Sequence, residues 1–114
     1  KNYLGIAGIE KVNSLLPKVD RILVMSVHPG FPAQEFLPSA LPKLQAAYNS
    51  NLAHNYNLDI AVDGGISPKT SSSVAKAGAR TLIAGSSVFT SSLSIEDAIA
   101  SIRQLAQQGI EEVL

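Results

Sequence analysis

The chain alternates between short, wholly apolar runs and longer segments in which apolar residues recur every three or four positions. Apolar runs without polar alternation indicate strands that are covered on both faces, as in parallel sheets. The helical spacing indicates amphipathic helices. The predicted strands are 21–27, 59–62 and 81–84, and the predicted helices are 8–16, 37–48, 68–77 and one that begins after Ser94.

Capping residues mark several of these helix ends. Ser67 followed by Pro68 offers a capping hydroxyl and a proline at the first helical position. Gly78 offers the C-terminal cap of the same helix, because glycine adopts left-handed backbone at no steric cost. Ser94 with Asp97 three residues later resembles a capping box.

Other residues are expected to interrupt helices or to remain in solvent. The polar segment 49–57 contains four asparagines, and we expect a loop or a frayed helix end there. Gly109 is expected to stop the last helix. Asp59 is expected to be an ordinary surface charge, and Arg80 is expected to be solvated rather than bound to a ligand.

Strand and helix in alternation imply a parallel sheet. Two architectures have this pattern, an open doubly wound sheet and an eightfold barrel. A complete barrel takes roughly 250 residues, and about three strands cannot close one. The pattern therefore predicts a small open sheet or about half of a barrel.

The residues at the strand ends are those of a binding site. Asp63 stands where an apolar run stops, and Gly64 and Gly65 follow it directly. In a parallel barrel this places a carboxylate rigidly at the carboxyl end of a strand, and the glycines let the backbone turn and approach a ligand. An aspartate that only caps a turn is the alternative. The strands 21–27 and 81–84 also run into turns, at residues 28–31 and 85–87.

Composition narrows the classes of partner. The 114 residues contain nine basic and nine acidic side chains, so charge gives no reason to expect nucleic acid or an anionic membrane as partner. Cysteine is absent, which excludes disulfides and thiolate metal sites within these residues. No apolar run approaches the roughly 20 residues of a membrane span. A soluble cytoplasmic protein is the default expectation.

Three blocks of sequence resemble one known family. They are LVMSVHPGF (Leu23–Phe31), AVDGGI (Ala61–Ile66) and LIAGSSVF (Leu82–Phe89). In their order and spacing they are similar to the C-terminal half of the ribulose-phosphate 3-epimerases. The resemblance implies an α/β fold that is the C-terminal half of a (βα)8 TIM barrel, with residues 1–114 as a single partial domain that holds strands six to eight and their flanking helices.

The resemblance also implies a reaction in the pentose phosphate pathway. The family interconverts D-ribulose 5-phosphate and D-xylulose 5-phosphate by removing the proton at C3 and returning one to the opposite face. Two acid/base groups and a divalent metal that stabilises the enediolate serve this chemistry. Asp63 matches the second acid/base residue, which is also a ligand of the metal: zinc, iron(II), manganese or cobalt. The first aspartate, two histidines and a serine of the family have no counterpart here, so we expect no epimerase activity from these 114 residues unless a second chain completes the site.

The family's phosphate and sugar contacts are better represented. In the family, phosphate sits on the loops after strands seven and eight, at the start of a short helix, which the resemblance places here at 87–89. A glycine pair after the motif PGF is replaced here by Pro32 and Ala33, and proline has no N–H to donate. The substrate-binding positions implied by the resemblance are Met25, Gly30, Phe31, Pro32, Ala33, Gly64, Gly65, Gly85 and Ser86.

The sequence leaves other hypotheses about function and assembly open. The epimerases of allulose 6-phosphate share the same pattern. A non-catalytic, phosphate-binding half-barrel would keep the glycine turns without the chemistry. A half-barrel also exposes sheet edges and apolar faces, which predicts possible self-association into a homo-oligomer.

Overall fold

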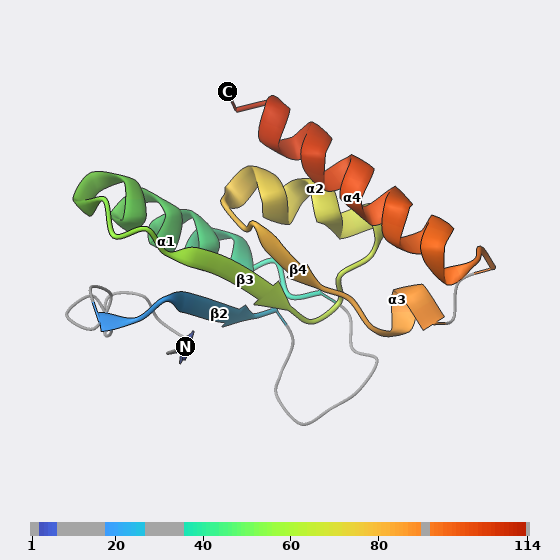
Figure 1. Cartoon of the computed structure of the whole chain (residues 1–114), viewed down its shortest axis with the longest axis horizontal. Helices are drawn as coiled ribbons and strands as arrows, with labels where there is room; N and C mark the ends of the chain where they lie inside the picture. The colour runs from blue at the N-terminus through green and yellow to red at the C-terminus, as the bar shows by residue number, and fades with distance from the viewer. Residues whose placement is uncertain (1–2, 7–17, 27–35, 90–91, 114) are drawn as a thin grey trace.

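The computed structural model describes residues 3–6, 18–26, 36–89 and 92–113, which form one parallel sheet with helices along one of its faces (Figure 1). Its strands are β1 (Tyr3–Ile6), β2 (Arg21–Met25), β3 (Asp59–Asp63) and β4 (Thr81–Ile83). Its helices are α1 (Ala40–His54), α2 (Pro68–Ala77), α3 (Ser86–Phe89) and α4 (Ile95–Glu111). No helix within these ranges is both long enough and apolar enough to cross a bilayer.

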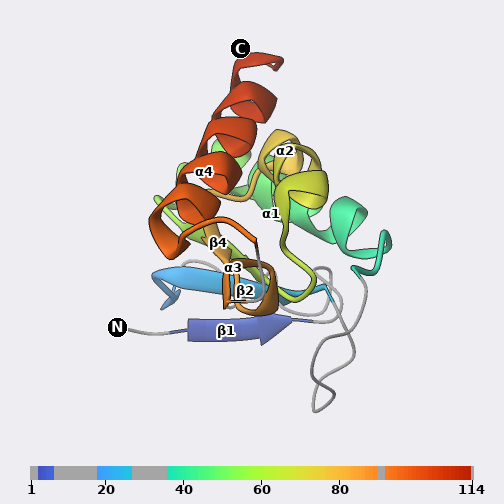
Figure 2. The same ribbon diagram turned by 90° about the vertical axis from the view of Figure 1, so that its right-hand side faces the viewer.

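The sheet confirms the predicted parallel α/β fold and contains one strand more than predicted. The strands lie in the order β1-β2-β3-β4, and each pairs in parallel with its neighbour. The strand that the sequence did not reveal is β1, which lies along β2 with Tyr3 opposite Arg21 (Figure 2). It has four residues, too few for apolar periodicity to identify it. The predicted helix 8–16 lies outside the described residues.

The core lies between the sheet and the helices. Alternate residues of β2, Ile22 and Val24, are fully buried, whereas their neighbours Arg21, Leu23 and Met25 are only partly buried. Successive side chains of a strand point to opposite faces, so one face of β2 packs into the core. The largest fully buried side chains are Ile22, Leu44, Ile60, Val24, Val62 and Val74.

The helix caps predicted from the sequence are present at both ends of α2. The Ser67 hydroxyl accepts a hydrogen bond from the Lys69 N–H, and the Thr70 hydroxyl accepts one from the Ser67 N–H at 3.0 Å. Gly78 ends the helix with a φ of 127°. Similarly, Ser94 caps the amino end of α4, where its hydroxyl accepts a hydrogen bond from the Asp97 N–H.

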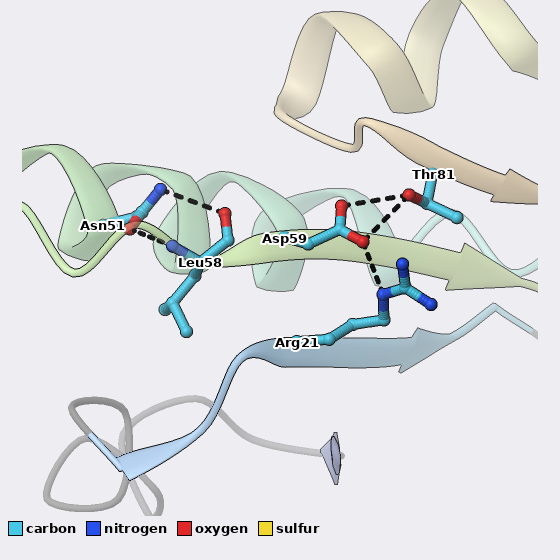
Figure 3. Close-up of polar contacts among 5 residues, drawn as sticks. All are labelled: Arg21, Asn51, Leu58, Asp59 and Thr81. Atoms are coloured by element: carbon cyan, nitrogen blue, oxygen red, sulfur yellow. Dashed lines mark hydrogen bonds and ion pairs between the residues drawn. The ribbon is translucent and has the colours of Figure 1, made fainter. Parts of the chain in front are cut away.

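The predicted end of α1 at residue 48 was wrong, because the helix continues through most of the segment expected to be a loop or a frayed helix end. It runs from Ala40 to His54 and ends at Asn55, which has left-handed backbone with φ 54°. The Asn51 side chain is the physical reason. It accepts a hydrogen bond from the Leu58 N–H at 2.9 Å and donates to the Leu58 carbonyl at 3.4 Å (Figure 3). The asparagine thereby ties the last turn of the helix to the start of β3.

The prediction that Gly109 stops the last helix was also wrong. Helix α4 passes through Gly109 and ends at Glu111. Gly109 is buried where α4 crosses α2, and a Cβ built on it would lie 2.3 Å from the carbonyl oxygen of Ser72. The glycine is needed because two helix backbones approach each other closely, not because the helix ends there.

A polar cluster links three strands near their amino ends. The Asp59 carboxylate forms an ion pair with Arg21 of β2 and accepts hydrogen bonds from the Thr81 hydroxyl of β4, at 3.0 Å to each of its oxygens (Figure 3). Its side chain is 31% exposed. The prediction that Asp59 is an ordinary surface charge is therefore wrong, because this carboxylate connects its own strand to both neighbours.

Candidate functional site

The carboxyl ends of three strands place Met25, Asp63 and Ile83 side by side. Asp63 is the last residue of β3, and the sheet register sets it opposite Met25 of β2 and Ile83 of β4. Asp63 is partly exposed, whereas Val62 before it is fully buried in the core. Because side chains alternate along a strand, the carboxylate belongs to the face away from the helices.

The turn after Asp63 requires both of its glycines. Gly64 has a φ of 118° and Gly65 has a φ of 68°, a region that side chains other than glycine rarely adopt. A Cβ on Gly65 would also lie 2.6 Å from the backbone nitrogen of Phe36. Among the described residues, no backbone acceptor pairs with the N–H of either glycine. The turn thus brings two glycine N–H groups next to Asp63 in the chain.

Hydroxyl groups hold the carbonyls of this turn from two sides. The Ser26 hydroxyl contacts the carbonyls of Asp63, at 3.0 Å, and of Gly64. The Thr70 hydroxyl, at the start of α2, donates to the carbonyl of Gly65 at 3.0 Å. The sequence analysis did not single out Ser26. The available signal was a serine directly after the apolar run 22–25, where a buried hydroxyl must find a partner.

The turn after β4 lies next to that after β3. Its Gly85 is exposed, and a Cβ there would meet nothing within 4 Å. The Gly85 carbonyl accepts hydrogen bonds from the N–H groups of Val88 and Phe89, at 2.9 and 3.1 Å, and so begins α3. The short helix predicted after β4 is confirmed. The N–H groups of Ser86 and Ser87 come before those of Val88 and Phe89 in the chain, so they have no acceptor within α3 itself.

Several predicted site residues lie outside the described part of the chain. They are the positions after β2 that the resemblance assigns to the substrate, namely Gly30, Phe31, Pro32 and Ala33. Among the described residues, His, Cys, Asp and Glu side chains form no group of three or more that could hold a metal ion. The described residues alone therefore do not fit a metal site, since Asp63 is one ligand and a firm site takes at least three.

These features define a class of protein. A carboxylate at the carboxyl end of a parallel strand, beside two glycine-containing turns and a short helix, is the arrangement by which barrel-type enzymes bind phosphorylated substrates. Residues 6–89 match the model of the ribulose-phosphate 3-epimerase family. The chain belongs to this family.

Curated relatives agree with the family match. A ribulose-phosphate 3-epimerase of Synechocystis is 43% identical over 91 residues, which are 78% of this chain and 38% of that protein. One from Candida glabrata is 42% identical over 84 residues, 74% of this chain and 32% of that protein. One from Methanocaldococcus jannaschii is 31% identical over 104 residues, 91% of this chain and 44% of that protein. The chain thus spans less than half the length of these relatives.

Proposed function

We propose that this chain supplies one acid/base residue and part of the phosphate site of a ribulose-phosphate 3-epimerase. The observation that carries the proposal is the placement of Asp63. Its backbone is paired on both sides within the sheet, and the two glycine turns open next to it. The family and the names of the relatives support the same activity.

In this proposal the Asp63 carboxylate takes or returns the C3 proton on one face of the ketose phosphate. Removal breaks the C–H bond, forms an O–H bond on the carboxyl group and leaves the electron pair in an enediolate. Inversion requires a second acid/base group on the other face. That group, and the further ligands of the divalent metal that the resemblance implies at Asp63, come from outside the described residues.

The phosphate is held by backbone N–H groups rather than by a basic side chain. Gly64, Gly65, Gly85 and Ser86 lie on the two neighbouring turns at the carboxyl edge of the sheet. A dianion accepts charge-assisted hydrogen bonds from such groups. Met25, opposite Asp63 in the sheet register, is proposed to line the sugar site. Gly30, Phe31, Pro32 and Ala33 are proposed to contribute from the loop after β2.

The wider setting is proposed on the same basis. The substrate is a phosphorylated ketose, the pathway is the pentose phosphate pathway, and the location is the cytoplasm. Residues 1–114 are proposed to form a single partial TIM-barrel domain, in which β2, β3 and β4 are strands six to eight of the barrel and β1 precedes them. A homo-oligomer also remains a prediction, supported by β4 being an edge strand and by a groove of about 490 Å³ lined partly by exposed Phe89, Ile95 and Ile99.

A ligand titration followed by backbone amide NMR tests the proposed binding site. The ¹⁵N-labelled chain is titrated with D-ribulose 5-phosphate, with unphosphorylated D-ribulose and with D-allulose 6-phosphate. We expect the pentose phosphate to shift the amides of Gly64, Gly65, Gly85 and Ser86 at lower concentration than the other two. Shifts confined to other regions would contradict the proposed site.

The same titration separates the alternative functions. Tighter binding of D-allulose 6-phosphate would favour the hexose-phosphate epimerase. Equal binding of both sugar phosphates and of inorganic phosphate would favour a phosphate-binding half-barrel without sugar recognition.

A further inference from the structure

Ser26 is the residue that joins the end of β2 to the turn carrying Asp63. It is fully buried, one of two polar residues in the described core. All of its polar groups are engaged. Its N–H donates to the Asp63 carbonyl at 2.8 Å, and its carbonyl accepts from the Leu37 N–H at 2.6 Å. Its hydroxyl contacts the carbonyls of Asp63, at 3.0 Å, and of Gly64.

These contacts fix the direction of the turn. A peptide plane is rigid, so holding the carbonyl of Gly64 also orients the N–H of Gly65 in the same plane. The Ser26 hydroxyl holds the Gly64 carbonyl, and the Thr70 hydroxyl holds that of Gly65. Both glycines have positive φ and no Cβ to restrict them. Without the two hydroxyls, these two glycines would lose the side-chain contacts that restrict their backbone.

We propose that Ser26 is a positioning residue, whose hydroxyl holds the Asp63–Gly65 turn in the conformation that receives the phosphorylated substrate. The inference rests on the proposed function of this turn and adds a residue to it. Ser26 does not touch the substrate in this proposal. It acts through the carbonyls of Asp63 and Gly64, which set where the carboxylate and the neighbouring N–H groups lie.

The test compares three substitutions with a matched control. Ser26→Ala removes the hydroxyl, Ser26→Thr keeps it, and Ser26→Cys retains a side chain of similar size with a weaker donor. The control is Ser71→Ala, because Ser71 is the other fully buried serine and its hydroxyl donates within α2, to the carbonyl of Pro68 at 3.4 Å. Thermal melts followed by circular dichroism establish that each variant folds.

The first readout is the backbone ¹⁵N order parameter of Gly64 and Gly65 in the free chain. Ser26→Ala is expected to lower it from about 0.85 to below about 0.6, with Ser26→Cys between. Ser26→Thr and Ser71→Ala are expected to match the wild type. If Ser26→Ala leaves both glycines as rigid as in the wild type, the proposal is wrong. This readout needs no ligand, so it decides the proposal even if the proposed function fails.

The second readout is the affinity for inorganic phosphate, measured from the same amides. Ser26→Ala is expected to weaken binding about three- to tenfold, as the loss of one hydrogen bond does, whereas Ser71→Ala is expected to leave it unchanged. Equal weakening in both variants would indicate a general loss of structure and would overturn the positioning role. A wild type that binds no phosphate, with Ser26→Ala mobilising the turn, would refute the phosphate site but not the role of Ser26.

Discussion

Gly65 lies against the backbone of Phe36, so closely that a Cβ on the glycine would sit 2.6 Å from the Phe36 nitrogen and 2.7 Å from its Cα. Phe36 lies shortly before α1, whereas Gly65 belongs to the turn after β3. Their contact therefore connects the candidate site to the chain that precedes the first described helix. Because the nearest atoms are backbone, they cannot move aside as a side chain would.

Gly65→Ala should consequently be strongly destabilising. Left-handed backbone is less stable for alanine by about 1–2 kcal/mol, and the overlap with Phe36 adds to this. We therefore expect the free energy of unfolding, measured by urea denaturation, to fall by about 2–4 kcal/mol. Gly85→Ala is the control, since a Cβ there meets nothing within 4 Å. It should change stability by less than about 0.5 kcal/mol. Equal effects of the two substitutions would contradict the described packing of Gly65.

Gly109→Ala should destabilise the protein, although alanine is the better helix former. In an exposed helix interior this change adds about 1 kcal/mol of stability. Here the new methyl would overlap the Ser72 carbonyl, at 2.3 Å, and we expect a net loss of about 1–3 kcal/mol. Gln108→Ala, on the exposed surface of the same helix, should be neutral or slightly stabilising. A stabilising Gly109→Ala would show that α2 and α4 are not so close.

Asn51→Ala should lower the free energy of unfolding by about 1–3 kcal/mol, because it leaves the N–H and carbonyl of Leu58 without their side-chain partner. The matched control is Asn49→Ala in the same helix. The Asn49 amide is exposed and accepts a bond only from the Gln45 side chain, at 3.0 Å, among the described residues. Its removal should cost less than about 0.5 kcal/mol. Thermal melts of both variants measure the difference, and no difference would mean that Asn51 does not tie α1 to β3.

The Arg21–Asp59 pair should show a modest coupling energy. Both side chains are about 30% exposed, at 28% and 31%, so solvent screens their attraction. A double-mutant cycle with Arg21→Met and Asp59→Asn is expected to give about 0.5–1 kcal/mol, and less at 1 M salt. If the destabilisation by the two single substitutions is simply additive at low salt, the attraction between Arg21 and Asp59 contributes nothing to stability.

Local sequence was sufficient to predict most of the sheet and the helix caps. The strands that begin at 21, 59 and 81 each continue from one polar residue into an apolar run. The caps at Ser67, Gly78 and Ser94 depend on neighbours within four residues. Such features are determined by the local chain. The turn at Gly64–Gly65 was predicted for the same reason, since both positive φ values favour glycine.

The features that were missed depend on contacts between distant residues. The length of α1 depends on Asn51 meeting Leu58, and the passage of α4 through Gly109 depends on Ser72 of another helix. Ser26 and Asp63 are far apart in sequence, and only pairing of β2 with β3 brings them together. In each case the prediction followed local sequence preference, whereas a contact between distant residues determines the observed structure.

The central claim, that Asp63 acts on the C3 proton of a ketose phosphate, is tested most directly by hydrogen exchange at that carbon. The chain is incubated in D₂O with D-ribulose 5-phosphate or D-xylulose 5-phosphate, with and without zinc, iron(II), manganese or cobalt, and deuterium at C3 is followed by NMR. A single carboxylate on one face predicts exchange in at least one epimer, lost in Asp63→Asn and kept in Asp97→Asn, whose carboxyl group is exposed at the start of α4. Exchange that survives in Asp63→Asn, or no exchange with any metal, would contradict the claim.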